Sequence, residues 1–410
     1  MLKSVSVLLA FWIPIGLAAQ TRSLPLPVDT EIAGKWNNIR VVDGGRFPQT
    51  GAGIQAAIDD IGASAGTVFL PPGVYIVSSE IRVTQVGLSI IGFGYSSELH
   101  LTDPKSNLFS VSGARFLLAD VEISTSARKT SGSVIYATAD QGTVRDVRLT
   151  GNFWNGFTLD TSKAGLWTFD GIRVPGGVSW NYLFHLQAAS GTVASTHLRN
   201  LVVSNTIRWN VASIVLDTGV DTFACSVCEL GPIVAQNSLG GQAPRWIRFD
   251  DTFIEAGLGG TIGGVGVDVR AARDFRYQGY IATSEIGAAI GAGARGVDIS
   301  HTEFVNIGRS AVTIAAGAQD TAIDQNTFED TGNVADGSYD TISAEPGASD
   351  FQITYNTFNS AMRNRPRNNV SVAPGGSDRY QIVGNRCRNY VRGAVNDGGT
   401  GRSRQVSENQ

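Results

Sequence analysis

Lysine is scarce in this chain. The 410 residues include only five lysines, whereas lysine and arginine together number 32, and the formal net charge is −4. This balance implies no extended basic surface, which argues against nucleic acid as a partner. No lysine follows Lys163, so a cationic base in the later part of the chain would have to be arginine or histidine. Nine arginines lie beyond residue 360, where they either solubilise the end of the chain or form a patch for an anionic surface.

Cysteine is also rare, with only Cys225, Cys228 and Cys387. Each falls where the local apolar pattern points inward, so we expect small buried side chains. A local disulfide between the first two is the alternative. The Cys-x-x-Cys pair has neither a second pair nor a nearby histidine, so no zinc or other metal site is predicted from it.

Long apolar runs are missing apart from residues 5–17. That run follows Lys3, is too short to cross a bilayer and ends in small residues, which is typical of a cleaved secretory signal over residues 1–19. We therefore expect an exported protein, secreted or periplasmic, with no membrane span. Residues 20–39 are then an N-terminal linker.

What the chain does contain is a repeat of about 27 residues. An apolar-x-x-apolar-x-apolar phrase recurs twelve times at intervals of 22 to 30 residues, often with Asp, Asn or Gly third. A period of this size predicts a solenoid in which each repeat is one coil. The fourth positions of the phrase are Ile91, Val121, Val147, Ile172, Leu201, Cys228, Thr252, Tyr280, Thr302, Asn326, Asn356 and Asn385.

The phrase fits a bent strand better than a helix, because one helix face cannot hold its apolar positions economically. A second strand follows in most repeats, for example at residues 132–137, 156–160, 213–217, 266–270, 311–315 and 369–373. Like residues of successive coils would then stack at ~4.8 Å along the axis. The predicted columns are Thr302, Asn326, Asn356 and Asn385 and, two residues on, Phe304, Phe328, Phe358 and Cys387.

The two ends of the repeat region differ. Ile54, Ala57, Ile58 and Ile61 recur at helical spacing, which predicts a short cap helix before the first strand. Residues 396–410 are polar and glycine-rich without an apolar period. We therefore expect a solenoid domain over residues 40–395 and a flexible tail over residues 396–410.

Four segments make the start of this region similar to a known superfamily. Residues 42–45, 53–58, 66–75 and 88–94 read VDGG, GIQAAI, GTVFLPPGVY and LSIIGFG. They resemble the pectate-lyase-like right-handed parallel β-helix superfamily, although residues 49–53 replace an Asp that is usual there. The resemblance implies an all-β right-handed parallel β-helix of about 12 coils with an N-terminal cap helix. The superfamily includes hydrolases, lyases, epimerases, tailspikes and adhesins, and homotrimers are common among such solenoids.

In enzymes of this superfamily, catalytic residues are stacked on neighbouring coils of one outer sheet face. A Trp-Asn pair recurs on three consecutive coils at coil spacing, and its members are Trp154, Asn155, Trp180, Asn181, Trp209 and Asn210. The three indoles would form a platform for sugar rings, with the asparagines bonding to the hydroxyls. Alternatively, the indoles fold inward and pack on one another.

A column of polar residues follows these pairs. The inward leucines would be Leu159, Leu186 and Leu216, and the outward residues next to them Asp160, Gln187 and Asp217. Carboxylates two coils apart have backbones separated by ~9.6 Å. That is near the ~6.5–9.5 Å range of an acid and a base in inverting glycoside hydrolysis. Asp160 and Asp217 are therefore the predicted catalytic pair, with His185 to orient one of them, while turn residues and a partly buried histidine are the alternative.

A second arrangement points to acidic sugars. Asp268 and Arg270 face outward on residues 265–269, and Arg208 precedes Trp209. An arginine beside an aspartate can neutralise a uronic acid carboxylate and ease removal of the C5 proton. The sequence thus favours a secreted glycoside hydrolase without a cofactor, acting on a polysaccharide. A lyase or epimerase on uronic-acid glycans and a non-catalytic, adhesin-like solenoid are the alternatives.

An acidic loop is the last candidate. It contains Glu329, Asp330, Asp336, Asp340 and Glu345, in a longer coil of 30 residues. Acidic groups this close either bind calcium or form a solvated loop.

Overall fold

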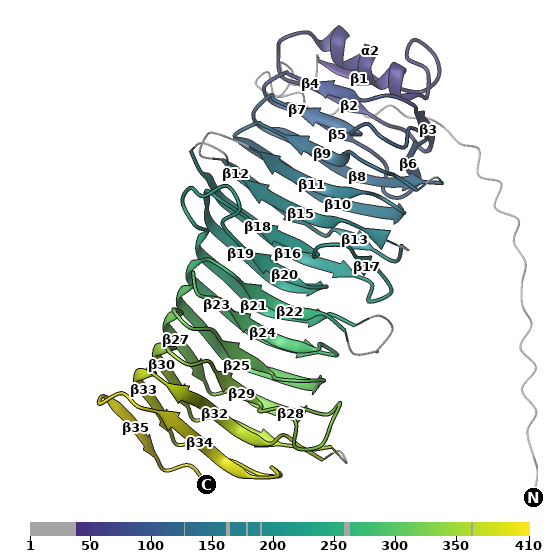
Figure 1. Cartoon of the computed structure of the whole chain (residues 1–410). Coiled ribbons are helices and arrows are strands. Elements are labelled where there is room, and N and C mark those ends of the chain that lie inside the picture. Colours follow the sequence, from purple (N-terminus) through teal and green to yellow (C-terminus); the bar gives the residue numbers. More distant parts are fainter. Residues whose placement is uncertain are drawn as a thin grey trace, which may run out of the picture. The chain divides into compact units, whose positions relative to one another are not determined.

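Each predicted repeat forms one coil that contributes strands to two parallel sheets (Figure 1). The computed structural model describes residues 38–126, 128–160, 165–177, 179–188, 191–257, 263–361 and 364–410. Sheet A has 20 strands and sheet B has 13, all paired in parallel. The 13 strands of sheet B are slightly more than the twelve repeats that the sequence reveals, and the prediction of an all-β parallel β-helix is confirmed.

The strands of sheet A are β1 (Ile39–Val41), β2 (Gly66–Phe69), β3 (Gly73–Val77), β5 (Leu88–Ile91), β6 (Ser97–Leu101), β8 (Phe116–Thr125), β10 (Gln141–Gly151), β12 (Leu166–Asp170), β13 (Arg173–Val174), β16 (Val193–Val203), β19 (Val220–Leu230), β21 (Arg245–Glu255), β23 (Arg273–Ala282), β25 (Arg295–Ile307), β27 (Gln319–Asp324), β28 (Thr327–Thr331), β30 (Ser349–Thr354), β31 (Thr357–Asn359), β33 (Asp378–Val383) and β35 (Arg404–Ser407). Those of sheet B are β4 (Ile81–Val83), β7 (Phe109–Val111), β9 (Ser133–Ala137), β11 (Asn155–Asp160), β15 (Tyr182–Gln187), β18 (Ile214–Leu216), β20 (Ile233–Ala235), β22 (Val265–Val269), β24 (Ile286–Ile290), β26 (Val312–Ile314), β29 (Ile342–Ala344), β32 (Asn368–Gly375) and β34 (Gly393–Gly399). A small third sheet pairs β14 (Ser179–Trp180) with β17 (Arg208–Trp209).

The third position of the repeat is a bend in sheet A. Its residue has a positive φ in coil after coil, with 57° at Asp120, 51° at Asp146, 68° at Gly171 and 54° at Asn200. This left-handed region favours glycine, asparagine and aspartate, which explains why those types recur there. The bend turns the strand around the core, so the apolar positions on both sides of it point inward.

Inside the last coils, identical side chains stack as predicted. The amide nitrogen of Asn356 donates to the side-chain oxygen of Asn385 at 3.0 Å, and Asn326 donates to Asn356 in the same way at 3.1 Å. The rings of Phe304, Phe328 and Phe358 follow one another at 4.8 Å between centroids. These columns satisfy buried amides and fill the core at the same time, which fixes the register of the coils.

Two predictions about the repeat were wrong. In the eighth repeat Gly279, not Tyr280, pairs with Thr252 and Thr302, because a register shift in β23 moves Tyr280 to the outer face. Residues 396–410 do not form a flexible tail. They contain β35 and part of β34, and the Asn409 side chain extends the asparagine column by accepting from the Asn385 amide at 2.8 Å.

The start of the described chain is capped as expected. Helix α2 (Gly51–Ile61) buries Ile54, Ala57, Ile58 and Ile61, and Thr50 accepts a hydrogen bond from the Gly53 amide at 3.1 Å as its N-cap. The predicted signal over residues 1–19 lies outside the described residues, as does nearly all of the linker over residues 20–39. No helix in the described part of the chain is long and apolar enough to cross a membrane.

The three cysteines are buried, as predicted. Cys225 and Cys228 are joined by a disulfide, which was the alternative offered by the sequence, and Cys387 is free.

Candidate functional site

The outer face of sheet B carries most of the predicted site residues. Leu159 pairs with Leu186 and Leu186 with Leu216, and all three leucines are fully buried. Asp160 pairs with Gln187 in the same register. The predicted outward column is therefore formed, on β11, β15 and the residue after β18.

Asp217 cannot serve as the predicted catalytic carboxylate, because it is only 2% exposed and fully hydrogen-bonded. Its Oδ1 accepts from the backbone amides of Thr218 and Ser238 at 2.7 and 2.8 Å, and its Oδ2 accepts from Gln236 Nε2 at 2.8 Å. Burial would raise the pKa of Asp217, but the nearby His185 ring and hydrogen bonds from Ser238 and Gln236 outweigh it and hold that pKa well below the usual range. Asp217 is a turn residue that ties two coils together.

His185 supports this buried carboxylate. Its Nε2 lies 3.9 Å from Asp217 Oδ2, and its ring is 4.8 Å from the Tyr182 ring in an edge-on contact. Nε2 itself is buried, so that nitrogen does not face a ligand. His185 thus lies beside Asp217 without a hydrogen bond to it, and the carboxylate that it was predicted to orient is structural.

Asp160, the other predicted catalytic residue, is half-buried. Its Oδ2 accepts a hydrogen bond from the Tyr136 hydroxyl on the preceding coil at 3.0 Å. Burial raises the pKa of Tyr136, and the Asp160 carboxylate raises it further by favouring the protonated phenol. The next two residues of its column are Gln187 and the buried Asp217, so neither gives Asp160 an exposed carboxylate to complete the hydrolytic pair.

The Trp-Asn pairs stack in the predicted register but do not form the predicted platform. The backbone N–H groups of Asn181 and Asn210 donate to the backbone carbonyls of Trp154 and Trp180, respectively, both at 2.8 Å. Trp180 is completely buried, with its ring 5.2 Å from that of Phe153. An exposed row of three indoles is therefore excluded, because the middle ring packs into the core.

The asparagines of these pairs behave differently from one another. Asn155 is 8% exposed and accepts from Asn181 Nδ2 at 3.2 Å, so this contact joins two coils. Asn210 is exposed. The third pair lies beside open space, since Trp209 is half-buried and lines a cleft.

This cleft brings four predicted substrate-binding residues together. It has a volume of about 470 Å³, and its lining includes Arg208, Trp209, Asp268 and Arg270. The Trp209 indole lies over Gly231, where a Cβ would come within 2.2 Å of the indole nitrogen. Glycine at that position is thus required for Trp209 to lie as it does. Ile207, Val211, Val234 and Val265 supply apolar walls.

The charges in the cleft are unequally paired. Arg270 Nε donates to Asp268 Oδ2 at 2.8 Å, and its Nη1 donates to Gln236 Oε1 at 3.1 Å. Arg208 is exposed and makes no ion pair with any described residue. The cleft therefore contains one fixed guanidinium and one that is available to an anion.

Sequence reasoning missed Gln236, which joins Asp217 to Arg270. Gln236 directly follows β20 and so occupies the same column as Asp160, Gln187 and Asp217. Extending that column by one coil would have found it. Nothing in the spacing indicates that Tyr136 reaches Asp160, because that contact depends on side-chain length.

The acidic loop does not gather its carboxylates. Asp340 is buried and paired with Arg367, and Asp336 pairs with Arg365 at 3.5 Å. Within the described ranges, no group of three or more His, Cys, Asp or Glu side chains could hold a metal ion. Arginines from the next coil thus neutralise two of the five charges that the sequence offered for calcium.

No family model and no curated protein matches this chain. Among solved structures, the A-module of the mannuronan C-5 epimerase AlgE4 of Azotobacter vinelandii is similar, with a TM-score of 0.51 and 15% identity over 90% of this chain and 99% of that one. The AlgE6 A-module of the same organism has a TM-score of 0.50 and 16% identity over 90% and 98%. The DFA-IIIase of Arthrobacter chlorophenolicus A6, without its lid, has a TM-score of 0.50 and 12% identity over 89% and 100%.

At these identities the similarity establishes the fold alone. The chain has the right-handed parallel β-helix fold that its N-terminal segments predict.

Proposed function

We propose that this protein is an enzyme that acts on a uronic-acid polysaccharide bound along the outer face of sheet B. The observation that carries the proposal is the cleft in which Arg208, Asp268 and Arg270 lie beside the Trp209 indole. Two guanidinium groups, one carboxylate and an aromatic ring are the groups that an acidic sugar requires for binding and for proton transfer.

Binding would use the two arginines and the indole. The uronate carboxylate would accept hydrogen bonds from Arg208, which has no ion-pair partner among the described residues, and from Arg270. The C–H face of the sugar would pack on Trp209. Asp160 lies four strands from Asp268 on the same face, roughly 19 Å away, and Tyr136 lies one strand further; both would contact another sugar of the chain.

The chemistry would begin at C5 of the bound sugar. Neutralising the carboxylate acidifies the C5 proton, and a carboxylate that takes over Arg270 frees Asp268 Oδ2 to accept that proton. The electron pair left on C5 then has two outcomes. It can form the C4–C5 double bond as the C4–O4 bond breaks and the departing O4 takes a proton from water, which is elimination. Alternatively, C5 can take a proton from water on its other face, which is epimerisation.

Two observations support this chemistry over hydrolysis. The predicted acid–base pair of Asp160 and Asp217 is lost because Asp217 is buried and its oxygens are occupied. Two of the similar folds belong to mannuronan C-5 epimerases. An exported location and a homotrimer, both expected from the sequence, would suit an enzyme of extracellular polysaccharides and stay predictions.

The test is a reaction screen with the purified full chain. Polymannuronate, polyguluronate, polygalacturonate and a neutral β-1,4-glucan are incubated, and the ultraviolet absorbance of unsaturated uronate, the reducing ends and the C5 configuration by NMR are recorded. We expect unsaturated ends or inverted C5 centres on a polyuronate, lost in Arg270→Ala. Arg309→Ala, which removes an exposed arginine paired with Glu285 on a later coil, is the matched control. Reducing ends without unsaturation would show hydrolysis and overturn the proposal.

A further inference from the structure

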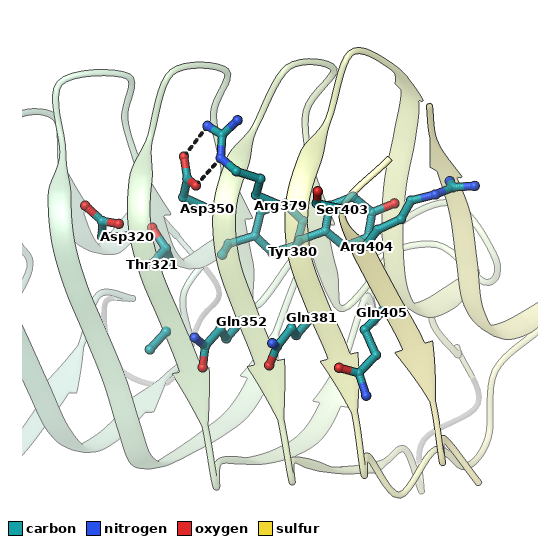
Figure 2. Close-up of a pocket in the computed structure, with 12 residues that line it drawn as sticks. Asp320, Thr321, Asp350, Gln352, Arg379, Tyr380, Gln381, Ser403, Arg404 and Gln405 are labelled. Atoms are coloured by element: carbon teal, nitrogen blue, oxygen red, sulfur yellow. Dashed lines mark hydrogen bonds and ion pairs between the residues drawn. The ribbon is translucent and has the colours of Figure 1, made fainter. Parts of the chain in front are cut away.

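A second hollow surface lies on the outer face of sheet A in the last coils. Two depressions of about 640 and 650 Å³ adjoin there, and both are lined by Gln352, Gln381 and Gln405 (Figure 2). We name this surface the glutamine groove. It belongs to β27, β30, β33 and β35, whereas the cleft described above involves sheet B, so the two are separate places on the coils.

The glutamines form a row. Gln352 pairs with Gln381 and Gln381 with Gln405 across neighbouring strands, and all three side chains are exposed. Figure 2 shows them side by side on successive strands. In the described chain their amides have no hydrogen-bond partner, unlike the asparagine column inside the same coils. Each coil thus presents one free donor group and one free acceptor, at a repeat of ~4.8 Å.

The arginines around the row, Arg276, Arg379 and Arg404, are each paired with an aspartate already. Arg379 donates to both oxygens of Asp350 at 2.6 and 2.7 Å, and Asp324 accepts from the Thr354 hydroxyl at 2.6 Å. Arg276 lies 3.6 Å from Asp298. Asp320 adds a negative charge to the lining. A polyanion would find no free cation among these pairs, so the surface suits an uncharged ligand.

An aromatic ring is held at the edge of the groove. Tyr355 is 62% exposed and lines one of the two depressions. Its ring lies over Gly384 of the next coil, where a Cβ would come within 2.7 Å of a ring carbon. Contact with this glycine restrains the exposed ring, which lowers the entropy lost when a ligand packs on it.

We infer that the glutamine groove binds a neutral, hydroxyl-rich glycan whose chain runs along the solenoid axis. A sugar hydroxyl both donates and accepts hydrogen bonds, as does a glutamine amide, and a polymer with regularly repeated hydroxyls matches a row of regularly repeated amides. The exposed Tyr355 ring offers a face for the C–H side of one sugar. This binding site goes beyond the proposed enzyme activity, because it neither contributes to the cleft nor requires an acidic sugar.

The experiment is isothermal titration with three hexasaccharides: a β-1,4-glucan, a β-1,4-mannan and an oligomannuronate. The titrations use the Arg208→Ala/Arg270→Ala protein, so that the cleft on sheet B does not contribute. Into it we introduce Gln352→Ala/Gln381→Ala/Gln405→Ala together or Tyr355→Ala alone. Gln141→Ala, an exposed glutamine of β10 far along sheet A, is the matched control.

We expect at least one neutral hexasaccharide to bind the Arg208→Ala/Arg270→Ala protein. Its affinity should fall at least tenfold after the triple glutamine substitution and several-fold after Tyr355→Ala. Gln141→Ala should leave the affinity unchanged. Circular dichroism confirms that each variant is folded. The inference is overturned if neither neutral hexasaccharide binds, if the triple substitution leaves binding unchanged, or if the oligomannuronate binds more tightly than both neutral chains. None of these results bears on catalysis at the sheet B cleft, which is measured with polyuronates and intact arginines.

Discussion

The outer faces of sheet B and sheet A belong to the same coils but are built differently. On sheet B, one column contains Asp160, Gln187 and Asp217, so the residue changes from each coil to the next. On sheet A, one column contains Gln352, Gln381 and Gln405, the same residue three times. A varied column can build one chemical site at one place, whereas a uniform column repeats one contact for as many coils as it lasts.

The two faces also treat charge differently. In the sheet B cleft, Arg208 has no ion-pair partner among the described residues, and Arg270 is shared between Asp268 and Gln236. In the glutamine groove, Arg379 is held by both oxygens of Asp350. A cation that is free or shared can exchange its partner for a substrate, whereas a bidentate ion pair holds its geometry. The comparison therefore assigns an acidic ligand to sheet B and a neutral one to sheet A.

The largest expected effect would come from Asp268→Asn, which removes the proposed base. Because proton transfer by a positioned side chain contributes 10²–10⁴-fold to rates, we expect kcat on the polyuronate substrate to fall by roughly 1000-fold with KM nearly unchanged. Steady-state kinetics measure both. Glu285→Gln, which alters the exposed Arg309–Glu285 pair one coil later, should leave kcat unchanged. A KM effect without a kcat effect would show that Asp268 only holds Arg270.

The next effect compares two tryptophans of one column. Trp180→Ala opens a cavity in the core and should lower the free energy of unfolding by about 4 kcal/mol. Trp209→Ala, at a half-buried ring, should cost clearly less stability but raise KM for the polyuronate roughly fivefold. Urea unfolding and kinetics give the two numbers. Equal losses of stability would mean that Trp209 is a core residue with no role in binding.

The coils could be predicted from the sequence because residues at the same position of successive coils contact one another and must therefore fit together. Asn326 and Asn356 form a hydrogen bond across neighbouring coils, so the spacing at which asparagine recurs in the sequence gives the register of the coils. The last coil was missed because residues 396–410 form strands through backbone pairing alone, without an apolar pattern. Asn409 follows Asn385 by 24 residues, which is within the repeat interval, and was the available signal.

The sequence predicted which residues of the candidate site lie in one column, but not which of them are buried. Spacing correctly put Asp160 and Asp217 in one column. It could not reveal that Gln236 and Ser238, about twenty residues further on, would fold over Asp217 and occupy its oxygens. The cleft residues Arg208 and Arg270 were found from their residue types, while their convergence depends on how one loop packs over the next coil.

A third prediction separates the inner and outer amides of one coil. Asn356→Ala removes a fully buried amide that bonds to Asn326, Asn385 and the Ile323 carbonyl, which leaves several groups unsatisfied. We expect a loss of about 3 kcal/mol in the free energy of unfolding. Gln352→Ala, on the outside, should change it by less than about 0.5 kcal/mol. A comparable loss of unfolding free energy in Asn356→Ala and Gln352→Ala would mean that the glutamine row stabilises the coils. That result would count against the row as a ligand-binding surface.

The smallest effect tests the structural role of Asp217 through pH. The pKa of Asp217 in the folded protein is held well below its usual value. The contribution of Asp217 to stability is therefore complete above the unfolded-state pKa of about 3.9. It declines at lower pH, because there the unfolded chain takes up a proton at Asp217 and the folded chain does not. Asp217→Asn should therefore be less stable than the parent by about 2 kcal/mol at pH 7, and the difference should shrink toward about pH 3.

Urea unfolding at several pH values measures this difference. Asp251→Asn is the control, because this exposed aspartate sits at the bend where Asn200 shows that asparagine fits, with φ of 47° and 54° at the two positions. The free energy of unfolding of Asp251→Asn should equal that of the parent at every pH. A difference for Asp217→Asn that is constant or grows toward acid would mean that the carboxylate is not preferentially ionised in the folded protein.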